Sequence, residues 1–394
     1  MASLALTLAA LATSAVPGLT AVAVRRHNPS GSDYSSAILT TTDDEVIVSV
    51  PRHSQAETAQ SAAILGMTAL SDGVRSALPF TAPHVLGITR AGETRAVAMT
   101  YLTGSRFTVR DLTEDARLLE SIAESIAAIH ALPRSIVRHT GLPDRSARDQ
   151  RLAIARVVDR AAATRKLPET VHHRWTEVLE EAPLWDFAPC IVHGGLSDET
   201  LLVDEERISG VLGWSGFGVG DPASDLAWLL EAGAEVFEAA LSHYLGAGGS
   251  GDAQALRSRA VLYHELEIAR WLLHGVDAHD ESVVDDAVGM LDRLVDRLSI
   301  LASPLAGRET LDEAGAEELL ERTPEVVDRL SDTAAYEALD EDRMFGVDTD
   351  FIEPLSREGS SEPTESSDSE EHDDSPDPEE QLTQPIADED LPRA

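Results

Sequence analysis

The sequence predicts an α+β chain with a small β-rich lobe, a larger helical lobe and a disordered acidic tail. Three observations predict this class. Apolar and β-branched runs separated by turn residues fill residues 18–105, whereas apolar residues recur every three or four positions from residue 113 onward. After about residue 306 the composition becomes acidic and Ser-rich. We therefore place the domain boundaries at residues 1–104, 105–305 and 306–394.

The first lobe is expected to hold four strands and two helices. Thr42-Asp43-Asp44 is a turn signal that predicts a hairpin. No positive charge precedes the apolar N-terminal run, so we expect residues 1–18 to form a helix packed on this lobe rather than a secretion signal. The expected strands are 19–24, 36–41, 45–50 and 96–102, and the second helix is 55–70.

The second lobe is expected to be mostly helical. Leu118, Ile122, Ile126 and Ile129 recur at helical spacing before Pro133 and predict an amphipathic helix. Short apolar runs at 190–192 and 208–212 predict two strands and a hairpin within this lobe. Further helices are expected at 147–164, 171–182, 223–231, 234–245, 253–274 and 282–301.

The charge of the chain excludes two classes of partner. The formal net charge is -39 over 394 residues, and residues 308–394 hold 30 acidic against 6 basic side chains. Nucleic acid and anionic membrane surfaces would repel such a chain, so we expect neither as a partner. Cys190 is the single cysteine and excludes an internal disulfide, which is typical of a cytoplasmic protein.

The acidic tail contains a few apolar residues that could dock on a protein partner or on the parent domain. These are Tyr336, Met344, Phe345, Phe351 and Ile352. The alternative is residual hydrophobicity without a role. Too little apolar surface is available in the rest of the tail to offset the entropy of ordering it.

Three motifs follow one another in the second lobe. His193-Gly194-Gly195-Leu196 is followed by Thr200, then by Gly210-Val211-Leu212-Gly213-Trp214, and then by Gly220-Asp221-Pro222 with Asp225-Leu226-Ala227. Their order and spacing resemble the core of the aminoglycoside phosphotransferase family, which includes macrolide phosphotransferases. That family has His-Gly-Asp-Leu, an Asn five residues after this Asp, Ile-Asp-Trp, and Gly-Asp-Pro with Asp-Leu-Ala. The resemblance covers about residues 1–300 and implies a two-lobed, protein-kinase-like fold.

The resemblance also implies where the catalytic groups should lie. Kinase-like transfer uses a strand lysine on the phosphates, a base aspartate, and an Asn and a second Asp on magnesium. The matching positions here are Ser49, Gly195, Thr200 and Gly213. The composition requires two of these losses in any alignment, because the only lysine is Lys166 and the only asparagine is Asn28.

Other positions of the family pattern are kept. The resemblance implies that His193 braces the catalytic loop. We expect Asp221 to cap the following helix and Asp225 to lie near the start of that helix, where a carboxylate suits the helix dipole. Gly31, Ser49 and Met99 are the candidates for a nucleotide cleft, with Gly31 also readable as an ordinary turn. No metal ligands are expected, and ATP or GTP would bind weakly and without magnesium.

Several polar residues are candidates for replacement catalytic groups. Asp198, Glu199 and Arg52 would serve an active ATP- or GTP-dependent O-phosphotransferase with relocated groups, although a solvated loop is the simpler interpretation of the two acids. A dense set of acidic and histidine residues lies between His264 and Asp280 but lacks the His-Glu-x-x-His zinc spacing, so we interpret it as a polar helix end. Trp214, Trp228 and Trp271 are expected to be core aromatics.

The leading hypothesis is a catalytically degenerate pseudokinase that binds a small molecule or a protein partner. The alternative is the active aminoglycoside or macrolide phosphotransferase with relocated groups. A third reading is a scaffold whose cleft is closed and empty. The sequence names neither the ligand nor the oligomeric state.

Overall fold

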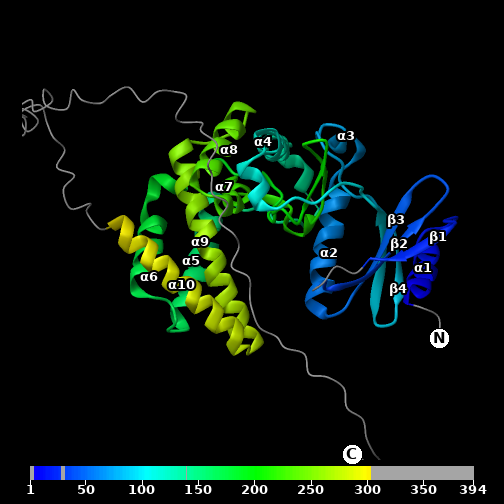
Figure 1. The fold of residues 1–394 in the computed structure, drawn as a ribbon, viewed down its shortest axis with the longest axis horizontal. Helices are drawn as coiled ribbons and strands as arrows, with labels where there is room; N and C mark the ends of the chain where they lie inside the picture. Colours follow the sequence, from blue (N-terminus) through cyan, green and yellow to red (C-terminus); the bar gives the residue numbers. More distant parts are fainter. Residues whose placement is uncertain (1–3, 28–31, 139, 303–394) are drawn as a thin grey trace, which may run out of the picture. The chain divides into compact units, whose positions relative to one another are not determined.

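The structure of the protein is a computed structural model that describes residues 4–27, 32–138 and 140–302. The predictions for Gly31 and for the acidic tail lie outside these residues. The described part is a β-sheet N-terminal region followed by a helical C-terminal region, as the sequence predicts (Figure 1).

The N-terminal region is built on a five-stranded antiparallel sheet in the order β1-β2-β3-β5-β4. The predicted hairpin is confirmed, since Thr41 N–H donates to the Asp44 carbonyl at 2.9 Å between β2 and β3. The first strand begins later than predicted, and β4 was not predicted. The strands are β1 (Ala23–Arg26), β2 (Tyr34–Thr40), β3 (Glu45–Pro51), β4 (Val85–Ala91) and β5 (Thr94–Thr100).

The predicted N-terminal helix is present as α1 (Leu4–Ala15), which packs on the sheet (Figure 1). Its residues Leu8 and Ala12 form a buried cluster with alternate sheet residues, among them Leu39 and Val48. Because side chains alternate along a strand, the neighbours of these residues face away from α1. Ile47 and Ser49 of β3 thereby face a cavity on the side of α2 (Ser54–Ala69).

The helical region follows the predicted segments closely. After the short helix α3 (Asp72–Arg75), α4 is amphipathic and buries the predicted stripe from Leu118 to Ile129. Its N-terminus is capped by Asp115, whose carboxylate accepts from the N–H groups of Arg117 and Leu118. The helices are α4 (Ala116–His130), α5 (Ala147–Ala163), α6 (Glu169–Glu180), α7 (Ala223–Leu226), α8 (Ala234–Gly246), α9 (Ala253–Ala278) and α10 (Glu281–Ala302).

Two small sheets lie within the helical region. The two predicted strands do not pair with each other. The second is β8 (Arg207–Val211), which forms a hairpin with β7 (Leu201–Asp204), a strand that was not predicted. The other predicted strand, β6 (Cys190–Val192), pairs with β9 (Gly218–Gly220), which was not predicted. Short 3-10 helices complete this region: η1 (Val109–Thr113), η2 (Arg134–Val137), η3 (Ala182–Trp185), η4 (Trp214–Gly216) and η5 (Ala227–Ala232).

The core expectation holds for two of the three tryptophans. Trp214 and Trp228 are buried, whereas Trp271 is 39% exposed. The prediction for Trp271 is wrong because its indole N–H pairs with the exposed side chain of Asp286, which holds the ring at the surface of the α9–α10 pair. Among the described residues, no helix combines the length and apolar character that a membrane crossing requires.

Candidate functional site

A cleft of about 640 Å³ opens between the sheet and the β7–β8 hairpin. We call this cavity the interlobe cleft. Ser49 and Met99 contribute from the sheet side, and Gly213 contributes from the segment after β8. The structure therefore brings three of the predicted site residues to one cavity. Gly31 lies outside the described residues.

A second cavity of about 600 Å³ lies on the other side of the same segment. Gly195 lines it together with the charged side chains of Arg145, Glu231, Glu267 and Arg270. Ser215 lines both cavities. The predicted base position, Gly195, and the predicted metal position, Gly213, thus line two different cavities that share Ser215.

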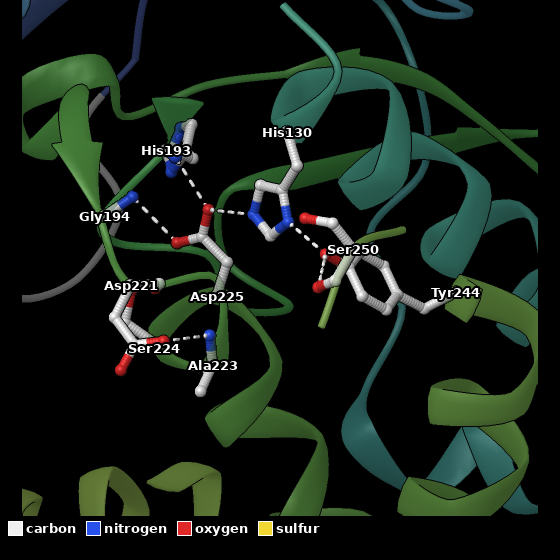
Figure 2. A network of polar contacts seen from close by, with 9 residues as sticks. All are labelled: His130, His193, Gly194, Asp221, Ala223, Ser224, Asp225, Tyr244 and Ser250. Atoms are coloured by element: carbon white, nitrogen blue, oxygen red, sulfur yellow. Dashed lines mark hydrogen bonds and ion pairs between the residues drawn. The ribbon is translucent and has the colours of Figure 1, made fainter. Parts of the chain in front are cut away.

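Asp225 holds the loop at His193 and Gly194 by hydrogen bonds (Figure 2). Its carboxylate accepts from the backbone N–H of His193 at 2.7 Å and of Gly194 at 2.8 Å, and from His130 Nε2 at 3.2 Å. The other ring nitrogen of His130 lies 2.9 Å from the Tyr244 hydroxyl. Burial alone would raise the pKa of the Asp225 carboxyl, but these hydrogen bonds and the nearby imidazoles together lower it.

The function of Asp225 differs from the expected dipole interaction. The residue does lie within α7, but its carboxylate turns back to the loop and is fully buried. Its hydrogen-bond partners are the backbone N–H groups of two successive loop residues, His193 and Gly194, and not the N–H groups at the start of α7.

His193 is fully buried against Trp214, with ring centroids 4.9 Å apart. Its Nε2–H donates to the Leu212 carbonyl at 2.9 Å, so the loop is tied to the end of β8. The other nitrogen, Nδ1, has no hydrogen-bond partner among the described residues. Burial lowers the pKa of His193, because a charged imidazolium would have to be desolvated. These contacts match the bracing role that the resemblance implies.

Asp221 is likewise buried and holds a second part of the frame. It accepts from Ala223 N–H at 2.9 Å at the start of α7, although the N-cap residue of that helix is Pro222 and not the predicted Asp221. It also pairs with the buried guanidinium of Arg259 at 2.7 Å and accepts from the Tyr263 hydroxyl at 3.2 Å. Burial raises the pKa of the Asp221 carboxyl, while Arg259 acts in the opposite direction. The sequence pattern did not predict Arg259.

Thr200 and Gly213 are neighbours at the predicted metal position. The Thr200 hydroxyl accepts from Ser197 N–H and donates to the Ser197 carbonyl, both at 2.9 Å, so it is occupied within its own turn. Gly213 has a φ of 80°, which favours glycine. A Cβ atom at this residue would lie 2.9 Å from Cγ2 of Thr200. Neither residue offers a carboxylate oxygen to a cation.

Gln60 is a residue of the interlobe cleft that no sequence motif marked. It lies on α2, is 5% exposed, and donates from Nε2 to the Ser49 carbonyl at 3.3 Å. Protein kinases use a charged pair, a strand lysine with a helix glutamate, beside the phosphates. The side chains of Ser49 and Gln60 are both neutral.

The candidates for relocated catalytic groups lie apart from the cleft. Arg52 is exposed, and its Nε donates to Ser35 Oγ at 3.3 Å. Glu199 is exposed, and its backbone carbonyl accepts from Arg106, which does line the interlobe cleft. Asp198 is half-buried. The pKa of Glu231 in the second cavity is raised mainly by burial and, to a smaller extent, by the negative charge of Asp198.

The acidic and histidine residues from His264 to Asp280 are divided among separate partners. Glu265 pairs with Arg174 at 3.0 Å, Asp277 pairs with Arg160 at 3.0 Å, and Asp280 accepts from Ser282 N–H at the start of α10. Within residues 4–27, 32–138 and 140–302, no group of three or more His, Cys, Asp or Glu side chains is arranged to hold a metal ion.

Solved structures with the same fold are macrolide and aminoglycoside phosphotransferases. Macrolide 2'-phosphotransferase MphH from Brachybacterium faecium is 21% identical, with a TM-score of 0.61 over 73% of this chain and 97% of that chain. Macrolide 2'-phosphotransferase type I is 26% identical, with a TM-score of 0.60 over 72% of this chain and 95% of that chain. The streptomycin and ATP ternary complex of APH(2")-IIa is 19% identical, with a TM-score of 0.56 over 74% and 97%.

No curated protein sequence is significantly similar to this chain. The family model described as the phosphotransferase enzyme family matches residues 26–262, from the last residue of β1 through the loop at His193 to the first part of α9. The chain belongs to the phosphotransferase enzyme family.

Proposed function

We propose that this chain is a pseudokinase of the phosphotransferase family, a protein that binds a small molecule in its cleft and transfers no phosphate. The observation that carries the proposal is the position of the Thr200 methyl group beside Gly213. A Cβ atom at position 213, from which a metal-binding carboxylate would have to extend, would lie only 2.9 Å from that methyl group.

The rate contributions of the missing groups favour a complete loss of phosphate transfer over a reduced rate of transfer. A general base contributes about 10²–10⁴ in rate, and a metal ion adds several kcal/mol of charge stabilisation. Gly195 has no side chain to act as a base, and Ser49 and Gln60 offer no charge to a phosphate. None of the residues at these family positions offers a carboxylate to a magnesium ion, so they do not fit this metal.

The frame of the site supports a binding role. His193, Asp221 and Asp225 are each fully buried and hydrogen-bonded into the loop or the helix after it. Two cavities of about 640 and 600 Å³ remain, and both fall within the size range of small-molecule sites. Solved structures with the same fold hold nucleotides and antibiotics, such as ATP with streptomycin.

The proposal is tested by phosphate transfer from labelled ATP and GTP, with magnesium, to an aminoglycoside and a macrolide. We expect no labelled acceptor above the level of a blank without protein, while an active family member labels its acceptor in the same assay. Labelled acceptor from the unaltered chain would overturn the proposal and restore the alternative of relocated groups.

Rebuilding the lost groups gives a second arm of the test. The combined variant Ser49→Lys, Gln60→Glu, Gly195→Asp, Thr200→Asn and Gly213→Asp replaces the missing ionic groups. Gly195→Asp is sterically open, because nothing lies within 4 Å of a Cβ atom at that residue. Activity in the rebuilt chain alone would locate the deficiency at these positions, whereas equal activity in both chains would contradict the proposal.

A further inference from the structure

A third cavity, of about 390 Å³, lies at the N-terminal end of α9. It is formed by η3 and the residues after it, by the loop between α8 and α9, and by the first turns of α9. We call it the α9 cavity; its lining includes Leu184, Phe187, Pro222, Asp252, Ala255 and Arg259. None of its lining residues also lines the interlobe cleft or the second cavity. Its volume lies within the range of small-molecule sites, so it is a separate candidate for binding.

The guanidinium of Arg259 lines the α9 cavity although the residue is only 1% exposed. Its Nε donates to Asp221 and its Nη1 donates to the Leu184 carbonyl, both at 2.7 Å. Among the described residues, Nη2 has no hydrogen-bond partner, and it is not one of the unpartnered side-chain atoms that are sealed from the surface. Nη2 therefore presents N–H groups from which a ligand oxygen can accept a hydrogen bond.

The walls around this donor are apolar. Leu184 and Phe187 line the cavity from η3 and the residues after it, and Pro222 lines it from the start of α7. The ring of Phe187 lies over the guanidinium of Arg259, with 4.3 Å between Cζ and the ring centroid. Burial against such surfaces stabilises an apolar ring, and the neighbouring guanidinium gives that ring a fixed donor for an attached oxygen.

Two carboxylates decide which charge the ligand can carry. Asp186 and Asp252 line the α9 cavity, and both residues are exposed. The positive charge of Arg259 is already paired with Asp221. A ligand carboxylate would add a negative charge beside these acidic side chains, which is unfavourable, whereas a ligand N–H group can donate to Asp186 or Asp252.

From these observations we infer that the α9 cavity is a binding site for a neutral aromatic carboxamide. The ring packs against Phe187 and Leu184, the carbonyl oxygen accepts from Nη2 of Arg259, and the amide N–H₂ group donates to a carboxylate of the lining. The inference is independent of the proposed function, because this cavity is separate from the cleft in which that function is placed.

The test is calorimetric titration of the full chain with benzamide, benzoate and benzylamine, which have the same size. Benzamide has a carbonyl acceptor and no charge, benzoate carries a negative charge, and benzylamine lacks the acceptor. We expect benzamide to bind at least about tenfold more tightly than either of the others, since a hydrogen bond to a charged group contributes this much. A smaller difference, or no binding of benzamide, would overturn the inference.

A blocking variant tests the location of the site. Ala255 is a partly buried alanine on the first turn of α9, so Ala255→Phe places a ring in the cavity and should abolish benzamide binding. Ala155→Phe on α5 is the matched control, because Ala155 is also a partly buried helix alanine packed on the same core but does not line the cavity. Binding that persists in Ala255→Phe, or that is lost equally in the control, would contradict the assignment.

A charge variant tests the selection against anions and needs no change in packing. Asp186→Asn with Asp252→Asn keeps the shape of the lining, and an Asn at position 252 can still cap α9. Benzoate affinity should rise at least about fivefold, while benzamide affinity should change less than about twofold. Asp277→Asn, near the other end of α9, should leave both affinities unchanged. A benzoate affinity that does not rise in the double variant would overturn the inference.

Discussion

The methyl group of Thr200 lies where a side chain at Gly213 would begin, with 2.9 Å between Cγ2 and the position of a Cβ atom. Thr200 cannot easily turn away, because its β-branched side chain is stiff and its hydroxyl is held by both the N–H and the carbonyl of Ser197. The two residues are therefore adapted to each other, and a change at one of them depends on the other.

This contact predicts non-additive mutations. Gly213→Ala should lower the free energy of unfolding by about 2–4 kcal/mol, from the strain of a non-glycine residue at positive φ and from overpacking against the methyl group. In a Thr200→Ser background, which keeps the hydroxyl and removes the methyl, the same change should cost about 1 kcal/mol less. Urea denaturation of the four chains measures the difference, and strictly additive costs would contradict the contact.

The buried ion pair predicts an asymmetric response to mutation. Arg259→Met should destabilise the chain by about 3–5 kcal/mol, because it leaves the Asp221 carboxylate buried without its partner at 2.7 Å. The double variant with Asp221→Asn should recover most of this loss in urea denaturation. As a control, Arg160→Met breaks an exposed pair with Asp277 and should cost less than about 0.5 kcal/mol. Equal costs for the two arginine variants would exclude this account.

His193 predicts a dependence of stability on pH. Burial lowers its folded-state pKa below the ordinary value of 6.5, so the unfolded chain binds the proton first as the pH falls. The stabilising contribution is complete above pH 6.5 and is lost as the pH falls toward the folded-state pKa. The free energy of unfolding should thus fall between pH 7.5 and pH 5.5, and it should fall less in His193→Gln.

The comparison must allow for two further histidines. Burial also lowers the pKa of His27 and of His264, so His193→Gln reduces the slope without removing it. A variant whose stability falls as steeply as that of the unaltered chain would show that His193 does not titrate as described.

The carboxylate of Asp225 should keep the loop at His193 and Gly194 rigid. Asp225→Asn replaces one acceptor oxygen with an N–H₂ group, which then faces donors from His193, Gly194 or His130. The backbone amides of His193 and Gly194 should exchange with deuterium at least tenfold faster, since a loss of about 1.4 kcal/mol corresponds to a factor of ten. Asp277→Asn on the surface should leave these two amides unchanged. Unaltered exchange in Asp225→Asn would mean that the carboxylate does not hold the loop.

The sequence predicted the elements whose signal is local. The stripe from Leu118 to Ile129 predicted α4, and the turn at Thr42-Asp43-Asp44 predicted the β2–β3 hairpin. The strands β4 and β9 were missed for physical reasons. None of the β4 side chains is buried, so its apolar pattern is weak, and β9 is Gly-Val-Gly, which has little strand propensity and is held by pairing with β6.

The site was predictable where a motif marked it and not where packing made it. Ser49, Met99 and Gly213 were selected from the sequence as site residues, and all three line one cavity in the structure. Gln60 and Arg259 carry no signal in the sequence, because a polar residue on a helix is ordinary until its buried partner is known. The direction of the Asp225 carboxylate also depends on a loop 31 to 32 positions away along the chain.

Ser215 lines both the interlobe cleft and the second cavity, so the two cavities share one side of their boundary. A ligand that displaces Ser215 from one cavity would change the volume of the other cavity. Through Ser215, the affinity of each cavity for its ligand would thus depend on whether the other cavity is filled.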